Sequence, residues 1–349
     1  MKVLVFEDPR KLYELRENWN QLYSRSCENS IFIEHGWVSS VWESLPAEKS
    51  FRLITVWNKD SLIAVLPLVI LKEKLILGIK FSFLYHLCCR FTDHSLILLD
   101  PGYSEKDILK KILTALQEIS SDADFVKIDN ISSSNKVSRL FLKGLRDLNL
   151  QSRYYVNVEN PILRLDEMGS IDGQQLKDVK RRQKKLESQF KVEICVGTSI
   201  DGDSWSRLVE FHKDRFGGVG FSSESAQEFY RLLMRSGFPK ENLEFSYLKV
   251  DSRIVAAHFG FRKNGVVYYY VPAYDQTMQR AGVGQILMLN IILHYSSKGY
   301  QVFDMLRGSE RYKFPWMSDE AFNFTFIGVG KKDFLSKCIL KLYLATKLL

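Results

Sequence analysis

The sequence predicts an α/β protein (α+β, with a mixed sheet) that is built as two tandem domains. Segments rich in β-branched and aromatic residues alternate with segments of helical periodicity along the whole chain. The chain has 349 residues, which exceeds the length at which a single hydrophobic core usually stops growing. A hairpin pattern also occurs once in each half, as NKDSLIAVLPL at 58–68 and as KVDSRIVAAHF at 249–259.

The repeated hairpin pattern has two explanations. Both copies place Asp-Ser at a tight turn between two β-rich runs, and turns of this kind recur in unrelated proteins. If the chain is instead a tandem duplication, each half is one α/β unit, and the boundary lies between residues 150 and 170. We predict an N-terminal domain over 1–160, a C-terminal domain over 161–330 and an amphipathic helix over 331–349.

The first half shows strands and helices in alternation. Strands are expected at VLVF, FRLITVW, SLIAVLPLVIL, SLILL and DFVKID, which are residues 3–6, 51–57, 61–71, 95–99 and 124–129. Helices are expected from Lys11 to Tyr23 and over KDILKKILTALQEIS at 106–120, where apolar residues recur at helical spacing.

The second half repeats this alternation after the loop ENPILRLDEMGSIDGQQ at 159–175. Helices are expected near 176–189 and 205–211, and strands at LEFSYLKV, IVAAHFGFR and VVYYYV, which are 243–250, 254–262 and 266–271. The segment from Gly284 to Lys298 is apolar nearly all round and is followed by Gly299, so it predicts a buried helix with a glycine at its end. QVFDML at 301–306 then supplies the next parallel strand.

The cysteines and the apolar runs indicate in which cellular compartment the protein is expected. Five cysteines, of which Cys88 and Cys89 are adjacent, form no C-x-x-C pair, so we expect neither a disulfide framework nor a metal site. The first residues carry too short an apolar stretch for a signal peptide. The longest uncharged apolar run, LIAVLPLVIL at 62–71, is about half the length of a membrane span. A cytoplasmic protein is therefore expected.

The net charge favours acidic partners. The formal charge is +8 and the isoelectric point is near 9.0, which suits nucleic acid, anionic lipid or phosphorylated small molecules. Lysine-rich surfaces also serve solubility alone, so this observation leaves both explanations open.

The stretch YDQTMQRAGVGQILM at 274–288 joins a strand directly to the apolar helix. Gly282 and Gly284 remove two side chains where the backbone turns into that helix, so that several N–H groups can point outward. The helix dipole adds positive potential at the same end. Together these features predict a backbone nest that binds a pyrophosphate without a cationic side chain.

Two common nucleotide-binding motifs are absent from this stretch. A P-loop requires G-x-x-x-x-G-K-[ST], and no such lysine is present; a dinucleotide fold requires G-x-G-x-x-G, but Leu287 stands at the third position. An ordinary β-α-β crossover with a glycine-rich turn is a further alternative. It explains the helix and the strand but not the long polar excursion YDQTMQRAG.

The spacing from Gln279 to Gly284 resembles the Q-x-x-G-x-G pyrophosphate loop of the GNAT superfamily of acyl-coenzyme A transferases. The preceding strand, GVVYYYVPA, contains Pro272, which belongs where a strand leaves its neighbour, and in GNAT folds the pantetheine arm lies in such a splay. The resemblance implies acetyl-CoA or another acyl-CoA as co-substrate, and backbone N–H groups near Tyr270 that bind the thioester oxygen. The implied coenzyme site is Val271, Gln279, Arg280, Ala281, Gly282, Val283, Gly284 and Gln285.

The order of further stretches resembles a narrower family, the tandem GNAT proteins known as cellulose-biosynthesis or CelD-like acetyltransferases, which are relatives of the Fem-type aminoacyl transferases. Besides the hairpins and the glycine stretch, the matching segments are FIEHGWVSSVWESL, LKDVKRRQKKLE, FHKDRFGG and FDMLRGSERYKFPW. These segments lie between residues 32 and 316 and therefore span most of the chain.

Two departures from this family limit what is carried over. Many members have Ser-Pro-Gly where this chain has Arg280-Ala281-Gly282, so the loop is closer to the general superfamily pattern. The first half has no counterpart of the loop, because DPGYSEKDILKK at 100–111 offers one glycine and acidic neighbours that would repel a pyrophosphate. We expect the N-terminal domain to bind no coenzyme and to form a wall of the acceptor site.

Acyl transfer from a thioester to an amine needs a neutral amine, a donor for the oxyanion and a proton for the departing thiolate. Tyrosine is the usual thiolate acid in the GNAT superfamily, so the resemblance implies Tyr312 in this role, with Tyr274 and Tyr295 as substitutes. As the base, Asp304 at the end of its strand is preferred to His258, because ligands collect at carboxyl strand ends whereas a histidine in an apolar strand is more often a core residue. No cysteine lies in a Cys/His/Asp setting, so no covalent acyl-enzyme is expected.

Three basic features have both a functional and an ordinary explanation. Arg307 and Lys313 meet phosphates if they follow the Fem-type relatives, and Lys313 is otherwise a snorkelling side chain. The basic helix at 176–187 is most simply a solvated face, so nucleic acid is not expected as a partner. The amphipathic helix at 331–349 either docks on the protein or makes peripheral contact with an anionic membrane surface.

The sequence as a whole predicts an acyl-CoA-dependent N-acyltransferase, most simply an acetyltransferase. The CelD-like resemblance implies an acceptor that is a small-molecule amine, such as an amino sugar or another precursor of surface polysaccharide, reached in the cytoplasm or at the inner face of the membrane. The alternatives are a Fem-type transferase that uses aminoacyl-tRNA in peptidoglycan bridge synthesis, and a non-catalytic module of polysaccharide assembly.

Overall fold

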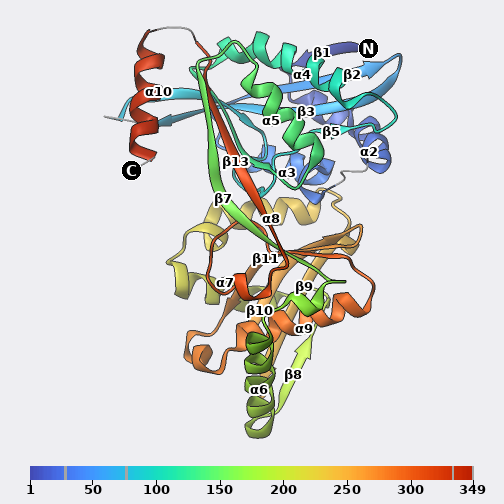
Figure 1. Cartoon of the computed structure of the whole chain (residues 1–349), viewed down its shortest axis with the longest axis vertical. Helices are drawn as coiled ribbons and strands as arrows, with labels where there is room; N and C mark the ends of the chain where they lie inside the picture. Colours follow the sequence, from blue (N-terminus) through green and yellow to red (C-terminus); the bar gives the residue numbers. More distant parts are fainter. Residues whose placement is uncertain (27–29, 75–77, 332–333, 348–349) are drawn as a thin grey trace. The chain divides into compact units, whose positions relative to one another are not determined.

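The computed structural model of the chain describes residues 1–26, 30–74, 78–331 and 334–347 (Figure 1). It divides into two compact units: unit 1 is made of residues 1–158 and 322–349, and unit 2 of residues 159–321. Both boundaries fall inside strands, β7 (Ser152–Arg164) and β13 (Asp319–Val329), so the chain passes from one unit to the other within a strand.

Unit 1 is a mixed sheet with helices. Its strands are β1 (Lys2–Phe6), β2 (Lys49–Asn58), β3 (Ser61–Lys74), β4 (Lys80–His86), β5 (Leu98–Leu99) and β6 (Phe125–Ser132). Its helices are α1 (Arg10–Glu14), α2 (Arg16–Arg25), α3 (His35–Ser44), α4 (Glu105–Ile119), α5 (Lys136–Arg146) and α10 (Phe334–Lys347). The strand order is β1-β2-β3-β4-β6-β13, with β5 paired to β3, and β4 and β6 are the parallel pair.

The core of unit 1 lies between the sheet and two amphipathic helices. In α4 the buried Ile108, Ile112 and Leu116 recur every four residues, which places them on one face of the helix. Phe141 and Leu145 of α5 join the same core. The spacing of the α4 residues is the one from which the sequence predicts a helix at 106–120, and the structure confirms that helix.

The first turn of α4 is acidic. Glu105 and Asp107 lie there, and the hydroxyl of Ser104 accepts a hydrogen bond from the Asp107 N–H at 3.4 Å. Negative side chains stabilise the positive end of a helix and repel an anion from it. The two carboxylates in this turn are therefore unfavourable for a bound phosphate.

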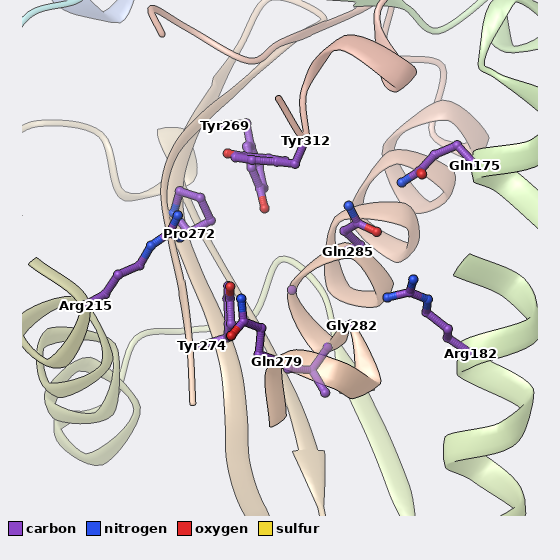
Figure 2. A pocket seen from close by; sticks show the side chains of 12 residues that line it. Gln175, Arg182, Arg215, Tyr269, Pro272, Tyr274, Gln279, Gly282, Gln285 and Tyr312 are labelled. Atoms are coloured by element: carbon purple, nitrogen blue, oxygen red, sulfur yellow. The ribbon is translucent and has the colours of Figure 1, made fainter. Parts of the chain in front are cut away.

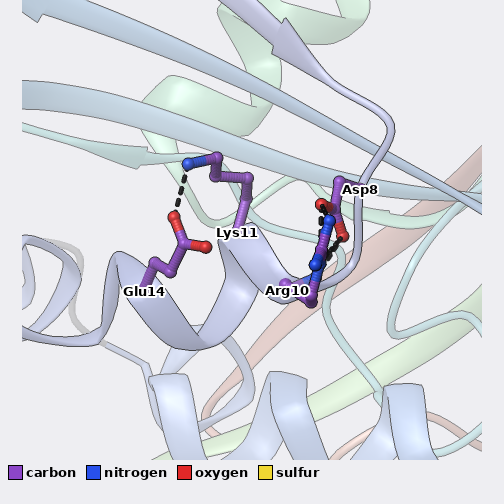
Figure 3. A network of polar contacts seen from close by, with 4 residues as sticks. All are labelled: Asp8, Arg10, Lys11 and Glu14. Carbon is purple, nitrogen blue, oxygen red and sulfur yellow. Dashed lines mark hydrogen bonds and ion pairs between the residues drawn. The ribbon is translucent and has the colours of Figure 1, made fainter.

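Short-range ion pairs surround α1 (Figure 3). Asp8 Oδ1 accepts hydrogen bonds from the backbone N–H of Arg10 at 2.9 Å and from its Nε at 3.0 Å, and these contacts lower the pKa of the Asp8 carboxyl. Lys11 pairs with Glu14 one turn further along. Because all four side chains are at least partly exposed, we expect these pairs to add little to the stability of the fold.

Unit 2 is built on the same plan. Its strands are β8 (Val192–Cys195), β9 (Leu243–Val250), β10 (Arg253–Lys263), β11 (Val266–Tyr274) and β12 (Val302–Asp304). Its helices are α6 (Gly173–Gln189), α7 (Gly202–Phe216), α8 (Glu224–Arg235) and α9 (Val283–Ser297), with a 3-10 turn, η7 (Gln276–Ala281), before α9. The order is β7-β12-β11-β10-β9-β8, and β11 and β12 are the parallel pair.

Strands and helices follow one another in the same order in the two units. The last strand of each unit, however, comes from the other half of the chain. Each half runs through antiparallel strands into one helix and one parallel strand, β4-α4-β6 in unit 1 and β11-α9-β12 in unit 2. The strand that follows β6 in the chain, β7, pairs through residues 162–164 with β12, whereas β13 pairs through 323–329 with β6. Residues 322–330, which the sequence places in the C-terminal domain, consequently lie in unit 1.

The repeated Asp-Ser pattern marks a hairpin in both halves, but the two turns are not equivalent. Lys59 and Asp60 form the turn between β2 and β3, because Asn58 pairs with Ser61. In the second copy the turn is Asp251-Ser252 itself, because Val250 pairs with Arg253. The sequence similarity is therefore offset by one residue from the structural turn.

The predicted elements are largely present, and their ends differ. The helix expected at Lys11–Tyr23 is divided into α1 and α2 at Leu15, and the strand expected at 95–99 is reduced to Leu98–Leu99. Residues 159–164 of the expected loop belong to β7. The elements not predicted are α3, β4, α5, β7, β8, α8 and β13.

Helix α9 is the centre of the unit 2 core. Val283, Ile286, Ile291 and other apolar residues around its circumference are buried, as predicted from the segment's composition, and Gly299 follows its end with a φ of 77°. Helix α6 packs against α9 through Val179 and Leu186, so one face of the basic helix is fixed to the core.

The described part of α10 has one buried face. Ser336, Ile339 and Leu340 are buried, while Leu342 is exposed. Burial of this face fits docking on the protein, and contact of the helix with a membrane stays a prediction. No helix in the described ranges combines the length and the apolar character needed to cross a bilayer.

The core position of α9 can be tested with two substitutions on one helix. Ile291 is 0% exposed, so Ile291→Ala should lower the free energy of unfolding by about 2–5 kcal/mol through lost burial and a cavity. Leu293 is 42% exposed, so Leu293→Ala should change it by less than about 1 kcal/mol. Urea unfolding measures both values, and similar losses for the two variants would contradict the packing of α9.

Candidate active site

The candidate site begins where β11 parts from β12. The two parallel strands pair over three residues each, 266–268 with 302–304, and β12 ends at Asp304. Strand β11 continues to Tyr274 and keeps its pairing with β10 on the other side. The parting leaves this edge of β11 unpaired from Tyr269 onward within the described chain, whereas the sequence places it at Pro272, which still pairs with His258 of β10.

A pocket of about 370 Å³ occupies this region of unit 2 (Figure 2). It extends from the exposed part of β11 to the beginning of α9, and helices α6 and α7 contribute one arginine each. Its lining residues are Gln175, Arg182, Arg215, Tyr269, Pro272, Tyr274, Gln279, Gly282, Val283, Gly284, Gln285 and Tyr312. The volume lies within the usual range for small-molecule sites.

The glycine turn presents backbone amides at the N-terminus of α9. Gly282 has a φ of +72°, which favours glycine, and its own N–H donates to the Gln279 carbonyl at 3.0 Å. The N–H groups of Val283 and Gly284 have no acceptor within the described residues. The sequence predicts that Gly282 and Gly284 expose amides, and the structure offers those of Val283 and Gly284 instead.

Both glycines also permit close approaches by large side chains. A Cβ at position 284 would lie 3.0 Å from Cδ1 of Tyr274, and a Cβ at position 282 would lie 3.0 Å from Nη1 of Arg182. A residue with a side chain at either position would push these groups outward and change the shape of the pocket.

Two arginines lie at the positive end of α9. Arg182 comes from the basic helix α6 and Arg215 from α7, and Figure 2 shows them on opposite sides of the pocket. Neither guanidinium makes an ion pair with a carboxylate in the described ranges, although Arg215 lies 5.8 Å from the centre of the Tyr274 ring. Cations beside an uncapped helix N-terminus repel it, and an anion placed between them would relieve this repulsion.

Tyrosines form the apolar part of the pocket. Figure 2 shows Tyr269 and Tyr312 next to each other, and burial raises the pKa of both phenols, so both stay protonated at neutral pH. Tyr274 also faces the pocket. Tyr295 does not line it, and its hydroxyl accepts a hydrogen bond from Arg262 at 2.8 Å. Of the three tyrosines proposed as proton donors, Tyr312 and Tyr274 are therefore at the pocket.

The implied coenzyme residues divide into two groups. Gln279, Gly282, Val283, Gly284 and Gln285 line the pocket. The other three, Val271, Arg280 and Ala281, are not among its lining residues, and the side chain of Val271 is buried.

Asp304 does not line the pocket, and its carboxylate forms hydrogen bonds within the protein. It is 7% exposed, and its Oδ1 accepts hydrogen bonds from Asn160 Nδ2 at 2.9 Å and from the Leu306 N–H at 2.8 Å. These bonds close the turn after β12. The carboxylate therefore lies at a strand end, as predicted, but in a structural arrangement that does not present it as a base.

Each ring nitrogen of His258 also lies close to another group of the protein. Its Nδ1 lies 2.5 Å from Glu244 Oε2, and its Nε2 accepts a hydrogen bond from the Tyr270 N–H at 3.2 Å. The Tyr270 amide, which the resemblance assigns to the thioester oxygen, is therefore directed into the protein. Glu244 is not among the site residues predicted from the sequence.

Lys313 is held by its own loop. It is 4% exposed, and its Nζ donates to the Arg307 carbonyl oxygen at 3.0 Å and pairs with Glu310 at 2.9 Å. Arg307 is exposed and does not line the pocket. The structure thus brings neither of these predicted phosphate contacts into the pocket.

The pocket residues missed by the sequence analysis are Gln175, Arg182, Arg215 and Tyr269. Arg182 lies in the basic run and three residues after the buried Val179, which is helical spacing. Only the packing of α6 on α9 distinguishes it from the neighbouring cations. Within the described residues, no group of three or more His, Cys, Asp or Glu side chains is placed to hold a metal ion.

Residues 173–314 match the family model of the acetyltransferase (GNAT) domain. This segment lies within unit 2 and contains every lining residue of the pocket. No curated protein sequence matches the chain. The GNAT resemblance inferred from the glycine stretch is therefore confirmed for this segment, and the narrower CelD-like resemblance stays a prediction.

Several solved structures resemble the whole chain. FemX has a TM-score of 0.62 and 11% identity, over 93% of this chain and 97% of its own. L-PGS from Bacillus licheniformis has a TM-score of 0.58 and 14% identity, over 96% of each chain. A tandem GNAT protein from the clavulanic acid biosynthesis pathway has a TM-score of 0.54 and 9% identity, over 95% of this chain and 100% of its own. These likenesses concern the fold alone, and they confirm the predicted mixed α/β fold class.

Gly260 provides a test of the local packing behind the pocket. A Cβ there would lie 2.3 Å from the Tyr268 carbonyl oxygen and 2.6 Å from Cε1 of His258, so Gly260→Ala should lower the free energy of unfolding by about 1–3 kcal/mol through overpacking. At Gly202, in the first turn of α7, a Cβ would meet no atom within 4 Å. Gly202→Ala should therefore be neutral or stabilising by less than about 1 kcal/mol. Equal losses in thermal unfolding would refute this account.

Proposed function

We propose that this chain is an N-acyltransferase that takes its acyl group from a coenzyme A thioester bound in the unit 2 pocket. The observation that carries the proposal is the N-terminus of α9, which opens on the pocket with the unpaired amides of Val283 and Gly284. Amides at a helix N-terminus bind phosphate groups, and Arg182 and Arg215 would neutralise the remaining charge of a pyrophosphate.

The shape of the pocket supports the same ligand. The edge of β11 between Tyr269 and Tyr274 that does not pair with β12 forms a wall that leads away from the glycine turn. An extended pantetheine arm could lie along this wall, since it carries amide groups that can bond to a strand edge. The family match over 173–314 supports the use of an acyl-CoA donor, because it covers this wall and the turn together.

Tyr312 is our candidate for protonating the departing thiolate. It lies at the pocket beside Tyr269, and burial raises the pKa of its phenol, so at neutral pH Tyr312 holds a proton that it can donate as the C–S bond breaks. Asp304 and His258 are engaged within the fold, so we assign no side chain as the base. We propose that the acceptor amine enters neutral and releases its proton to water.

The acceptor is inferred from the sequence resemblance. The CelD-like segments suggest an amino sugar or another amine precursor of surface polysaccharide, and the transferred group is most simply acetyl. An aminoacyl-tRNA donor is the competing proposal. This competing proposal is favoured by the exposed basic residues of α6 and by the similarity of the whole chain's fold to that of FemX. The pocket residues and the family match support the acyl-CoA donor more directly.

Donor binding is the first test. Acetyl-CoA at 100 times its Kd should stabilise the protein by about 2.7 kcal/mol, measured by thermal unfolding and confirmed by calorimetry. Gly284→Glu should abolish this shift, because the new side chain would collide with Tyr274 and its carboxylate would repel the pyrophosphate. Gly202→Glu, in the first turn of α7, adds the same charge at another helix end and should leave the shift unchanged.

The outcomes separate the three proposed functions. A shift with acyl-CoA that Gly284→Glu removes supports the leading proposal, and no shift with any acyl-CoA rejects it. Transfer of an amino acid from aminoacyl-tRNA that ribonuclease abolishes would establish the Fem-type alternative. Unchanged function of the Gly284→Glu variant in cells would indicate a non-catalytic module.

The contribution of the Arg182 charge to donor binding is tested by comparing its removal with the removal of Lys184, which lies on the same helix. Arg182→Ala should weaken acyl-CoA binding about tenfold, because a charge-assisted contact to phosphate is lost, and should reduce the dependence of binding on salt. Lys184→Ala removes an exposed cation outside the pocket and should change the Kd by less than about twofold. Isothermal titration at two salt concentrations measures both effects, and an equal response of the two variants would exclude a specific role for Arg182.

A further inference from the structure

The wall of the pocket contains a β-bulge. In the β10–β11 pairing Phe259 faces Val271 and Phe261 faces Tyr268, so the single residue Gly260 lies opposite both Tyr269 and Tyr270. The extra residue on β11 directly follows Tyr268, the last residue that pairs with β12. A bulge next to a site redirects side chains and ends regular pairing, and this one lies at the point where the two strands part.

The extra amide of the bulge is bonded to a side chain. The Tyr270 N–H donates to Nε2 of His258 at 3.2 Å, in place of a strand carbonyl. An Nε2 that accepts a hydrogen bond carries no proton, so the proton of the neutral ring is on Nδ1. Nδ1 lies 2.5 Å from Glu244 Oε2, an acceptor that stabilises this tautomer.

The pair is completely enclosed. Glu244 and His258 are 0% exposed, and the buried hydroxyl of Ser246 donates to the other oxygen of Glu244. Burying a carboxylate is costly even when it is paired, and apolar side chains of similar size would fill this space at lower cost. Filling the core therefore does not account for the pair.

The imidazole also supports a residue of the pocket. Its ring stacks on the ring of Tyr269 with centroids 4.3 Å apart and planes inclined by 13°. Gly260 makes room for this arrangement, because a Cβ there would lie 2.6 Å from Cε1 of His258. One side chain thus binds the backbone of the bulge and fixes the ring that faces the pocket.

We propose that Glu244 and His258 are positioning residues of the donor site. They hold the Tyr269–Tyr270 bulge in the conformation that directs Tyr269 into the pocket. Glu244 acts through His258 by fixing its tautomer, and neither residue touches the donor. This inference rests on the proposed function for the identity of the ligand, but the contacts that carry it belong to the protein alone.

Two substitutions separate the hydrogen bond at Nε2 of the imidazole from the close contact of Nδ1 with Glu244. The amide of His258→Gln reaches the position of Nε2 and can accept from the Tyr270 N–H. The amide of His258→Asn reaches the position of Nδ1 and can donate to Glu244, but removes the Nε2 atom that accepts from the Tyr270 N–H. We expect His258→Asn to weaken acetyl-CoA binding about tenfold and His258→Gln by less than about threefold, since an unmet buried N–H carries the larger penalty.

A second buried histidine provides the matched control. His86 in unit 1 is 1% exposed and also uses both ring nitrogens, with Nε2 at 2.9 Å from the Leu96 carbonyl oxygen and Nδ1 accepting from the Cys88 N–H at 3.2 Å. His86→Asn should lower the unfolding temperature and leave the Kd for acetyl-CoA unchanged. A structural role alone would make His258→Asn behave in the same way, and that result would overturn the proposal.

A measurement on the ligand-free protein distinguishes this inference from the proposed function. In protein labelled with ¹⁵N-histidine, His258 should show an unprotonated Nε2, and hydrogen exchange of the Tyr270 amide should accelerate in His258→Asn but not in His258→Gln. A protonated Nε2, or equal exchange in both variants, would overturn the inference even if acetyl-CoA binds. If acetyl-CoA does not bind to the wild-type protein, the proposed function fails, and the spectra and exchange rates still decide whether the pair holds the bulge.

Discussion

The short pairing of β11 with β12 is the constraint on which the site depends. A strand edge that loses its neighbour must find other partners for its N–H and C=O groups or expose them. Here the pairing ends at Tyr268, and β11 runs on to Tyr274 with only β10 beside it in the described chain. The pocket lies along the unpaired edge, the turn into α9 follows its end, and the bulge in the β10–β11 pairing begins at the residue where the parting begins.

Electrostatics at the turn adds a second constraint. An uncapped helix N-terminus with two free amides already carries positive potential, and Arg182 and Arg215 increase it. Such an arrangement is unfavourable in isolation and favourable around a multiply charged anion. The acidic first turn of α4 in unit 1 has the opposite character. The two units therefore share a fold while presenting helix ends of opposite electrostatic character.

The sequence predicts those features that depend on local patterns. The helix after Gly284, the glycine turn and Pro272 near a strand end follow from composition and spacing, and Tyr312 comes from the family resemblance; all of these lie at the site. Arg182 could not be separated from the other cations of its helix, because the packing of Val179 and Leu186 on α9 decides which way it faces. Glu244 was missed because an acidic residue in a strand is expected to face solvent, and only the register of β9 against β10 brings it to His258. The pairing of β13 with β6 joins residues nearly two hundred positions apart and leaves no local signal.

The exchange of β7 and β13 has a consequence for how the chain is made on the ribosome. Unit 1 lacks β13, which pairs with β6, until residues 322–329 have been synthesised, after the whole of unit 2. At ordinary translation rates that interval is roughly 10 to 30 seconds, long enough for β6 to stay an open edge to which other chains can add. A chaperone bound to the nascent N-terminal half, or slow folding of that half, would protect the edge of β6 until β13 has been made.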